Sequence, residues 1–200
     1  MDVAFQIAIL IMSVVIHEVS HGYAALMEGD HTAEYAGRLT LNHLKHLDLM
    51  VSFIVPLTCF LLQAPIFGWA IPVPFNPYNL KNRRWGEALV AIAGPASNIF
   101  IAIIFGFGIR FFGADLSHSM ALIFAMIVYI NLFLAIFNCV PVPPLDGSKI
   151  FFSLLPYRWS HVRTIMERYS LVLALFFIFF LWKFVVPLVS ILFTIITGLS

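Results

Sequence analysis

The stretch His17-Glu18-Val19-Ser20-His21 places two imidazoles and a carboxylate inside an apolar run from Val3 to about Met27. On a helix, His17 and His21 lie four residues apart on one face, so both rings can reach one Zn²⁺ ion. Glu18 points close to the same side and can accept a proton from a zinc-activated water. An unused carboxylate at the centre of a membrane helix costs about 2.5–3.5 kcal/mol, which argues against a chance pattern.

A catalytic zinc usually has three protein ligands and one open position, so a third ligand is expected. Asp146 is the best candidate, because it lies in a proline-rich break after an apolar run. Gly147 follows it, and an unwound chain there can aim the carboxylate inward. The alternative is that Asp146 only marks a turn or a helix end. Asp48 is a weaker candidate, since it resembles a cap for the apolar segment after it.

Two asparagines, Asn98 and Asn138, are uncharged polar residues within apolar runs. Either could join neighbouring helices through hydrogen bonds. Either could instead polarise a peptide carbonyl or hold an extended substrate. Asn138 is eight residues before Asp146, which favours a role at the site, whereas Asn131 and Ser97 are more simply packing residues.

The composition is that of a membrane protein. Of the 200 residues, 62% are hydrophobic and 10% are charged, whereas a soluble domain carries about 25% charged residues. Several runs are long enough to cross a bilayer. We therefore predict an all-α polytopic membrane protein that forms a single membrane-embedded domain over residues 1–200. The net charge of +1 argues against nucleic acid as a partner.

The apolar runs predict a helical bundle with three core spans and one C-terminal span. The predicted spans are residues 3–27, 85–112, 120–140 and 169–196, with the core over about 3–152. Within an insertion over residues 32–80, Glu34–Leu41 alternates loosely and predicts a short strand, and Ile71–Phe75 is expected to be extended, as an edge strand. Residues 157–168 are amphipathic and basic, which is typical of a membrane-surface segment, and they open the C-terminal part, residues 157–200.

Lysines and arginines follow the first predicted span, precede the second and follow the third. Cytoplasmic loops are enriched in these residues, so all three regions are expected on the cytoplasmic side. The segment 47–77 must then return to the side from which it starts, as a re-entrant or hairpin element. A full crossing at 47–62 is the alternative. With this orientation, His21, Asn98 and Asp146 all fall in the cytoplasmic half of the bilayer.

The sequence resembles the site-2 protease family of intramembrane zinc metalloproteases (peptidase family M50). The similarity covers about Phe5 to Phe152 and rests on three motifs in order. These are His17-Glu18-Val19-Ser20-His21, Gly94-Pro95-Ala96-Ser97-Asn98, and Asn138 with Pro144-Leu145-Asp146-Gly147. The chain looks closest to compact bacterial-type members without PDZ or CBS domains, which share Gly37–Asn42 and Phe75–Asn82. It departs from them at His43, where those members have proline, and at Ser148, where many have glycine.

The resemblance implies regulated intramembrane proteolysis of single-span membrane-protein substrates by an enzyme of the prokaryotic plasma membrane, in contact with membrane lipid. Carried over to this sequence, His17, His21 and Asp146 bind one Zn²⁺ and Glu18 is the general base. Asn98 and Asn138 would help to position the substrate. A substrate helix must unwind before cleavage, and we hypothesise that Glu34–Leu41 or Ile71–Phe75 clamps it by strand addition.

Two other functions use similar residues. A metal-ion transporter or channel would need polar residues through the whole bilayer, but here they cluster in one half. An inactive scaffold protein would tolerate the loss of Glu18, which is present. Both are less favoured than a protease.

Overall fold

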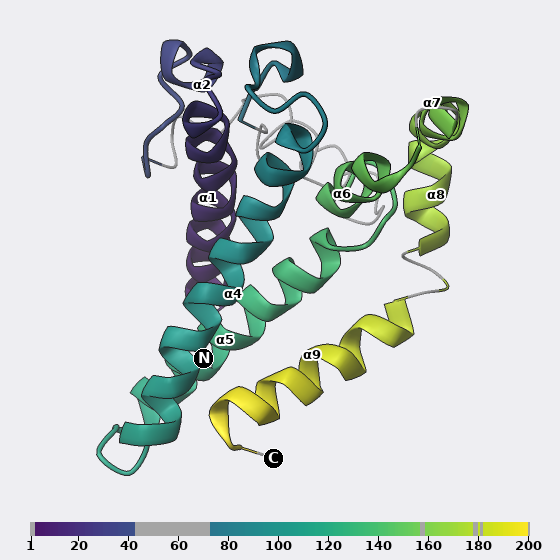
Figure 1. Cartoon of the computed structure of the whole chain (residues 1–200). Helices are drawn as coiled ribbons and strands as arrows, with labels where there is room; N and C mark the ends of the chain where they lie inside the picture. The colour runs from purple at the N-terminus through teal and green to yellow at the C-terminus, as the bar shows by residue number, and fades with distance from the viewer. Residues whose placement is uncertain (1–2, 43–72, 157–158, 178–179, 181, 200) are drawn as a thin grey trace, which may run out of the picture.

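The computed structural model describes residues 3–42, 73–156, 159–177, 180 and 182–199, and in this part of the chain it is helical with no β-strand (Figure 1). Its helices are α1 (Val3–Met27), α2 (Thr32–Tyr35), the short 3₁₀ helix η3 (Pro77–Asn79), α4 (Gly86–Phe112), α5 (His118–Asn138), α6 (Asp146–Leu154), α7 (Ser160–Arg168), α8 (Ser170–Phe176) and α9 (Trp182–Thr197).

Three helices are long and apolar enough to cross a membrane. They are Phe5–Met27 in α1, Gly86–Phe112 and His118–Asn138. Each end of these helices lies within two residues of the corresponding end of a predicted span. This agreement confirms the prediction of an integral membrane protein built of helices. The fourth predicted span, 169–196, corresponds to α8 and α9, and the apolar part of α9, Lys183–Thr197, is shorter than the other three. Residues 178, 179 and 181 lie outside the described part.

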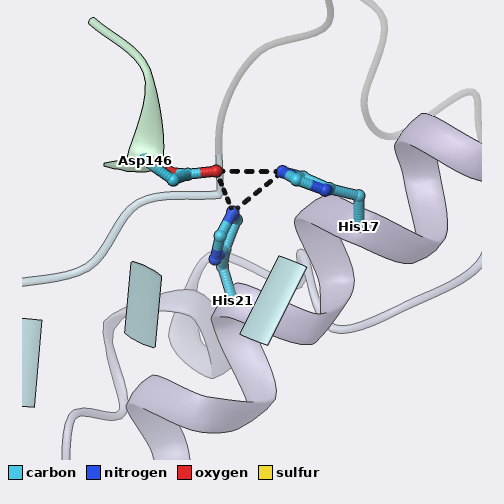
Figure 2. A group of neighbouring side chains, drawn as sticks. All are labelled: His17, His21 and Asp146. Carbon is cyan, nitrogen blue, oxygen red and sulfur yellow. Dashed lines mark hydrogen bonds and ion pairs between the residues drawn. The ribbon is translucent and has the colours of Figure 1, made fainter. Parts of the chain in front are cut away.

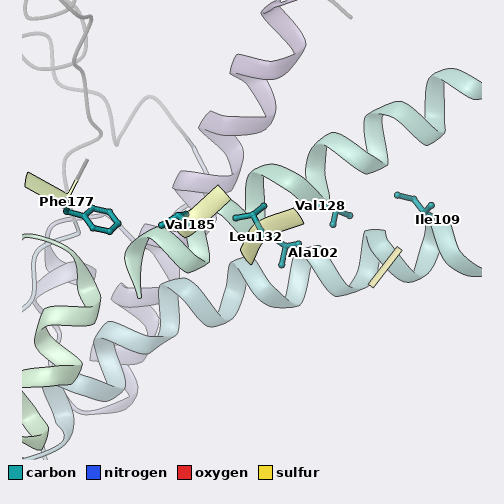
Figure 3. Packing of buried hydrophobic residues seen from close by; sticks show 7 residues of the cluster. Ala102, Ile109, Val128, Leu132, Phe177 and Val185 are labelled. Carbon is teal, nitrogen blue, oxygen red and sulfur yellow. The ribbon is translucent and has the colours of Figure 1, made fainter. Parts of the chain in front are cut away.

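Helix α4 is central, because it packs against α1, α5, α6 and α9. A buried cluster joins α4, α5 and α9, and Figure 3 shows Ala102 and Ile109 of α4 near Val128 and Leu132 of α5. Other large side chains of α4, such as Phe100 and Phe111, are exposed on the outside of the bundle. A helix that is apolar on all sides suits a lipid surface, where helices associate by close packing rather than by hiding from water.

The end of α1, the start of α4, α6 and α7 lie together at one end of the molecule (Figure 1). Helix α5 ends beside α6, and only the turn 139–145 separates them. Helix α6 also packs against α4. This arrangement brings the second half of α1 close to the start of α6, although more than 100 residues separate them in the sequence.

The predicted strand at Glu34–Leu41 is wrong. Residues 32–35 form α2, whose backbone bonds run from Tyr35 N–H to His31 O and from Ala36 N–H to Thr32 O. Gly37 then adopts a φ of 63°, a left-handed conformation that suits glycine and ends the helix. Local helical hydrogen bonds and the glycine turn therefore prevail over the loose alternation of apolar residues.

The second predicted strand is also not supported. Val73–Phe75 form no regular secondary structure, and Ile71 and Pro72 lie outside the described residues. The predicted re-entrant segment, 47–77, falls mostly outside them too. From Asn76 onwards the chain is fastened to the end of α1, where Asp30 Oδ2 accepts from Asn76 N–H at 2.6 Å and Glu28 O accepts from Lys81 N–H at 2.8 Å.

Candidate metal centre

Three side chains from distant parts of the sequence converge at the junction of α1 and α6. His17 Nε2, His21 Nε2 and Asp146 Oδ2 form a triangle in which each pair of atoms is 3.1 Å apart (Figure 2). All three residues are buried, with exposed fractions of 5%, 7% and 7%. The structure therefore brings together the two histidines of the motif and the carboxylate that the sequence favoured as their partner.

The outer nitrogen of each imidazole is already hydrogen-bonded to an acceptor. His17 Nδ1 donates to Asn98 Oδ1 at 2.6 Å, and His21 Nδ1 donates to the carbonyl of Val90 at 2.7 Å. With hydrogen on Nδ1, the neutral imidazole presents a lone pair at Nε2. Two nitrogen lone pairs and a carboxylate oxygen then face one another, an arrangement that a bound cation would stabilise.

The triangle also has the dimensions of a zinc site. Ligands of a tetrahedral zinc ion with bonds of about 2.0–2.1 Å lie roughly 3.3–3.4 Å apart, close to the observed 3.1 Å. Two imidazoles and one carboxylate are a donor set found in catalytic zinc sites, with a fourth position left open. His17, His21 and Asp146 can therefore hold a zinc ion with little rearrangement.

Two glycines explain why the backbone can approach this closely. A Cβ atom built on Gly94 of α4 would lie 2.6 Å from His17 Nε2 and 2.5 Å from His21 Nε2. A Cβ atom on Gly147 would overlap the backbone carbonyls of Cys139 and Val140 at the end of α5. Gly94 thus makes room for the imidazoles, and Gly147 lets α6 begin against α5 so that Asp146 faces them.

Glu18 borders the same cavity, which has a volume of about 180 Å³ and is also lined by His17, His21 and Asp146. Its Oε2 accepts a hydrogen bond from Val73 N–H at 3.0 Å. The carboxylate is therefore within the cavity, beside the triangle but not part of it.

The two asparagines have different positions. Asn138 lines the cavity, and its Nδ2 donates to the carbonyl of Leu134 at 3.0 Å. Asn98 is fully buried, and both ends of its amide are bonded within the bundle. Direct contact of Asn98 with a substrate, which the sequence suggested, does not fit this position. Asn98 contacts the proposed metal ligand His17 instead.

Sequence reasoning assigned Asn131 to helix packing, but its side chain is bonded to Asn98 and to Ser13. The sequence does show that Ser13, Asn98 and Asn131 are polar residues in apolar spans. That pattern could not show that they contact one another, because the contact depends on how α1, α4 and α5 face each other. Asp48, the weaker ligand candidate, lies outside the described residues.

Comparison with known proteins agrees with this geometry. The chain is 38% identical over 194 residues to a Bacillus subtilis protein named "Putative zinc metalloprotease YwhC", and the alignment covers 93% of this chain and 82% of that protein. The model of peptidase family M50 matches residues 107–181, which include Asp146. The chain belongs to peptidase family M50. Membership confirms a zinc-dependent metalloprotease of the membrane, as the resemblance to site-2 proteases predicted.

Other relatives are similar over shorter stretches. A Mycolicibacterium smegmatis protein named "Putative zinc metalloprotease Rip2" is 30% identical over 139 residues, which cover 68% of this chain and 52% of the relative. A Methanocaldococcus jannaschii protein named "Putative zinc metalloprotease MJ0611" is 32% identical over 108 residues, which cover 53% of this chain and 55% of the relative. No solved structure matches the chain.

Proposed function

We propose that this M50 protease is an intramembrane endopeptidase that cleaves single-span membrane-protein substrates in or near their transmembrane segments. The observation that carries the proposal is the buried triangle of His17, His21 and Asp146 inside a bundle of membrane-spanning helices. A zinc ion held there would meet peptide bonds at the depth of the lipid rather than in bulk water.

In this proposal His17 and His21 supply nitrogen ligands and Asp146 supplies an oxygen ligand. Bound zinc contributes Lewis acidity, which polarises a peptide carbonyl and activates water as a nucleophile. The second oxygen of Asp146, Oδ1, lies 3.4 Å from Lys149 Nζ. Lys149 therefore helps to hold the carboxylate ionised and oriented toward the imidazoles.

Glu18 is the proposed general base. Its carboxylate borders the cavity and lies next to His17 in sequence, so it can accept a proton from the attacking water and pass it to the leaving amide nitrogen. Its Oε2 accepts from Val73 N–H, and an ionised carboxylate has further lone pairs that could accept the water proton. That proton lets the C–N bond break with a neutral amine as the leaving group, and Glu18 returns to its ionised form.

Asn138 is the proposed substrate-positioning residue. Its Nδ2 carries two hydrogens, and the bond to Leu134 O uses one of them. The other can donate to a substrate carbonyl in the cavity. A donor of this kind stabilises the charge that develops on a carbonyl oxygen during attack.

We further propose that the site lies in the cytoplasmic half of a prokaryotic plasma membrane. The basic residues near the start of α4 and in α7 lie at the same end of the molecule as α6, whereas residues 113–117 between α4 and α5 contain no lysine or arginine. The positive-inside rule then puts the site end toward the cytoplasm.

The proposal is tested with Glu18→Gln in the full chain, reconstituted with a model single-span substrate. The variant is expected to keep zinc and lose cleavage, because Gln cannot accept the proton. Glu28→Gln is the matched control, since Glu28 lies one residue beyond α1 and its carboxylate accepts a hydrogen bond from the backbone N–H of Asn82. Cleavage by Glu18→Gln at the wild-type rate would contradict the assignment.

A further inference from the structure

A chain of buried amides leads from the carbonyl of Ile127 to His17. Asn131 Nδ2 donates to Ile127 O at 2.9 Å and to Ser13 Oγ at 2.9 Å. Asn98 Nδ2 donates to Asn131 Oδ1 at 2.8 Å and to Ser13 O at 3.3 Å. Asn98 Oδ1 then accepts from His17 Nδ1 at 2.6 Å. Both asparagines are fully buried and Ser13 is nearly so.

The direction of every bond in this chain is fixed by its far end. A backbone carbonyl can only accept, so the amide nitrogen of Asn131 must face Ile127 O. The amide oxygen of Asn131 then faces Asn98, so the amide nitrogen of Asn98 must donate to it. The carbonyl of Ser13 imposes the same orientation on Asn98. The oxygen of Asn98 is left facing His17, and an oxygen acceptor requires hydrogen on Nδ1.

We propose that Asn131 and Asn98 are positioning residues that set the tautomer of His17. This relay, defined as Ile127 O, Asn131, Asn98 and His17 Nδ1, keeps the Nε2 lone pair directed toward His21 and Asp146. It rests on the proposed metal-binding role of the triangle. The relay deepens that role, because it assigns a function to two asparagines that do not touch the cavity.

The amides are well suited to this task within the membrane. All four amide hydrogens of the two asparagines have acceptors, so the network adds no unpaired donor to the apolar interior. It also joins α1, α4 and α5, which fixes the ring plane of His17 as well as its tautomer. In the opposite tautomer, a hydrogen on Nε2 would occupy the side of the ring that faces the triangle.

The relay predicts an order of zinc affinities. Asn98→Leu removes the acceptor for His17 Nδ1–H and is expected to weaken zinc binding about 10–100-fold, as is typical for loss of a hydrogen-bond partner to a metal-binding histidine. Asn131→Leu should cause a smaller loss, because Ser13 O still orients Asn98. Asn98→Asp should bind zinc nearly as tightly as the wild type, since a carboxyl oxygen at this position can still accept from His17 Nδ1–H.

A matched control is Thr197→Val. Thr197 is buried in α9 and donates to Phe193 O at 2.8 Å, so its removal costs a buried hydrogen bond in a helix that contributes no residue to the relay. Zinc affinity is measured by competition with a chelator, and thermal unfolding of the zinc-free protein reports any general loss of stability. Asn98→Asp keeps the test informative if Asn98→Leu does not fold.

The second readout is the ¹⁵N NMR spectrum of the imidazoles in the zinc-free protein. The signals of His17 are assigned by their loss in His17→Ala. We expect hydrogen on Nδ1 in the wild type and in Asn98→Asp, and a mixture of tautomers in Asn98→Leu. A merely structural asparagine would not move this signal.

The outcomes separate the relay from the metal site. If His17→Ala binds zinc as the wild type does, the proposed metal site itself is wrong. If His17→Ala loses zinc but Asn98→Leu keeps wild-type affinity and the Nδ1 tautomer, the relay is overturned while the metal site stands. If only Asn131→Leu behaves as wild type, Asn131 has no part in the relay.

Discussion

The closest test of the site geometry is Gly94→Ala, because this single methyl group would point at both candidate ligand nitrogens. Its Cβ would lie 2.5 Å from His21 Nε2 and 2.6 Å from His17 Nε2, against 3.4 Å for ordinary contact. The rings would have to retreat by about 0.8–0.9 Å, whereas zinc–ligand distances vary by only about 0.2 Å. At least one imidazole must therefore leave the triangle.

We expect the zinc dissociation constant of Gly94→Ala to rise at least about 100-fold, which corresponds to about 2.7 kcal/mol. Alanine is favoured over glycine in a helix by roughly 0.5–1 kcal/mol, so weakening of α4 itself is not the cause. The assay is chelator competition on the purified, reconstituted protein, followed by cleavage of a model transmembrane substrate with added zinc.

Gly108→Ala is the matched control, since it makes the same change in the same helix. Its Cβ would lie 3.1 Å and 3.3 Å from two ring atoms of Phe124, and a small shift of that ring relieves the contact. This variant is expected to bind zinc as the wild type does. Wild-type zinc affinity in Gly94→Ala would refute the close approach of α4 to His17 and His21.

Three further predictions follow from the same contacts. Asp146→Ala should lose stoichiometric zinc, measured by elemental analysis, because it removes the oxygen of the triangle; retention of zinc would exclude Asp146 as a ligand. Gly147→Ala should also lose zinc affinity and cleavage, because its Cβ would overlap the carbonyls of Cys139 and Val140 and turn Asp146 aside; an unchanged variant would contradict that packing. Asp30→Asn should lower the melting temperature at neutral pH, because a carboxylate that accepts four hydrogen bonds would lose acceptors, each worth about 1–3 kcal/mol. Burial alone would raise the pKa of Asp30, but the hydrogen bonds from Thr32 and its other partners outweigh it and hold the pKa below its usual value. The stabilisation is therefore complete above pH ~4, the unfolded-state pKa, and is lost as the pH falls through the lower folded-state pKa. The gap in melting temperature between the wild type and Asp30→Asn should shrink accordingly in acid, and a gap that widens in acid would contradict the sign.

Asp30 shows how a structural role can be hidden in the sequence. The carboxylate follows α1 by three residues and reads as a simple helix end. In the structure it is fully buried and accepts from Thr32 on one side and from Asn76 and Asn79 on the other. It thereby fastens the segment that includes Val73 across the last turns of α1, where Val73 N–H reaches Glu18. No local pattern specifies partners some 45 residues away.

The sequence by itself determined the features that depend on local periodicity. Lengths of apolar runs predicted the three spanning helices, and the four-residue spacing of His17 and His21 predicted their shared face. The proline-rich break before Asp146 and its expected depth favoured it as their partner, and the structure brings its carboxylate to both imidazoles. The predictions of the spanning helices and of the shared face held because helix period and bilayer thickness are fixed lengths.

Only the tertiary structure decided which faces of the helices meet. In the structure Asn98 bonds to His17, and Asn131 bonds to Asn98. A side chain at Gly94 would clash with both imidazoles. The structure also replaced the expected strand at Glu34–Leu41 with a short helix and a glycine turn. The physical reason is that a buried polar group is stabilised by whichever partner the packing brings within hydrogen-bonding distance. The rotation of a helix about its own axis is set by the helices it packs against rather than by its own sequence pattern.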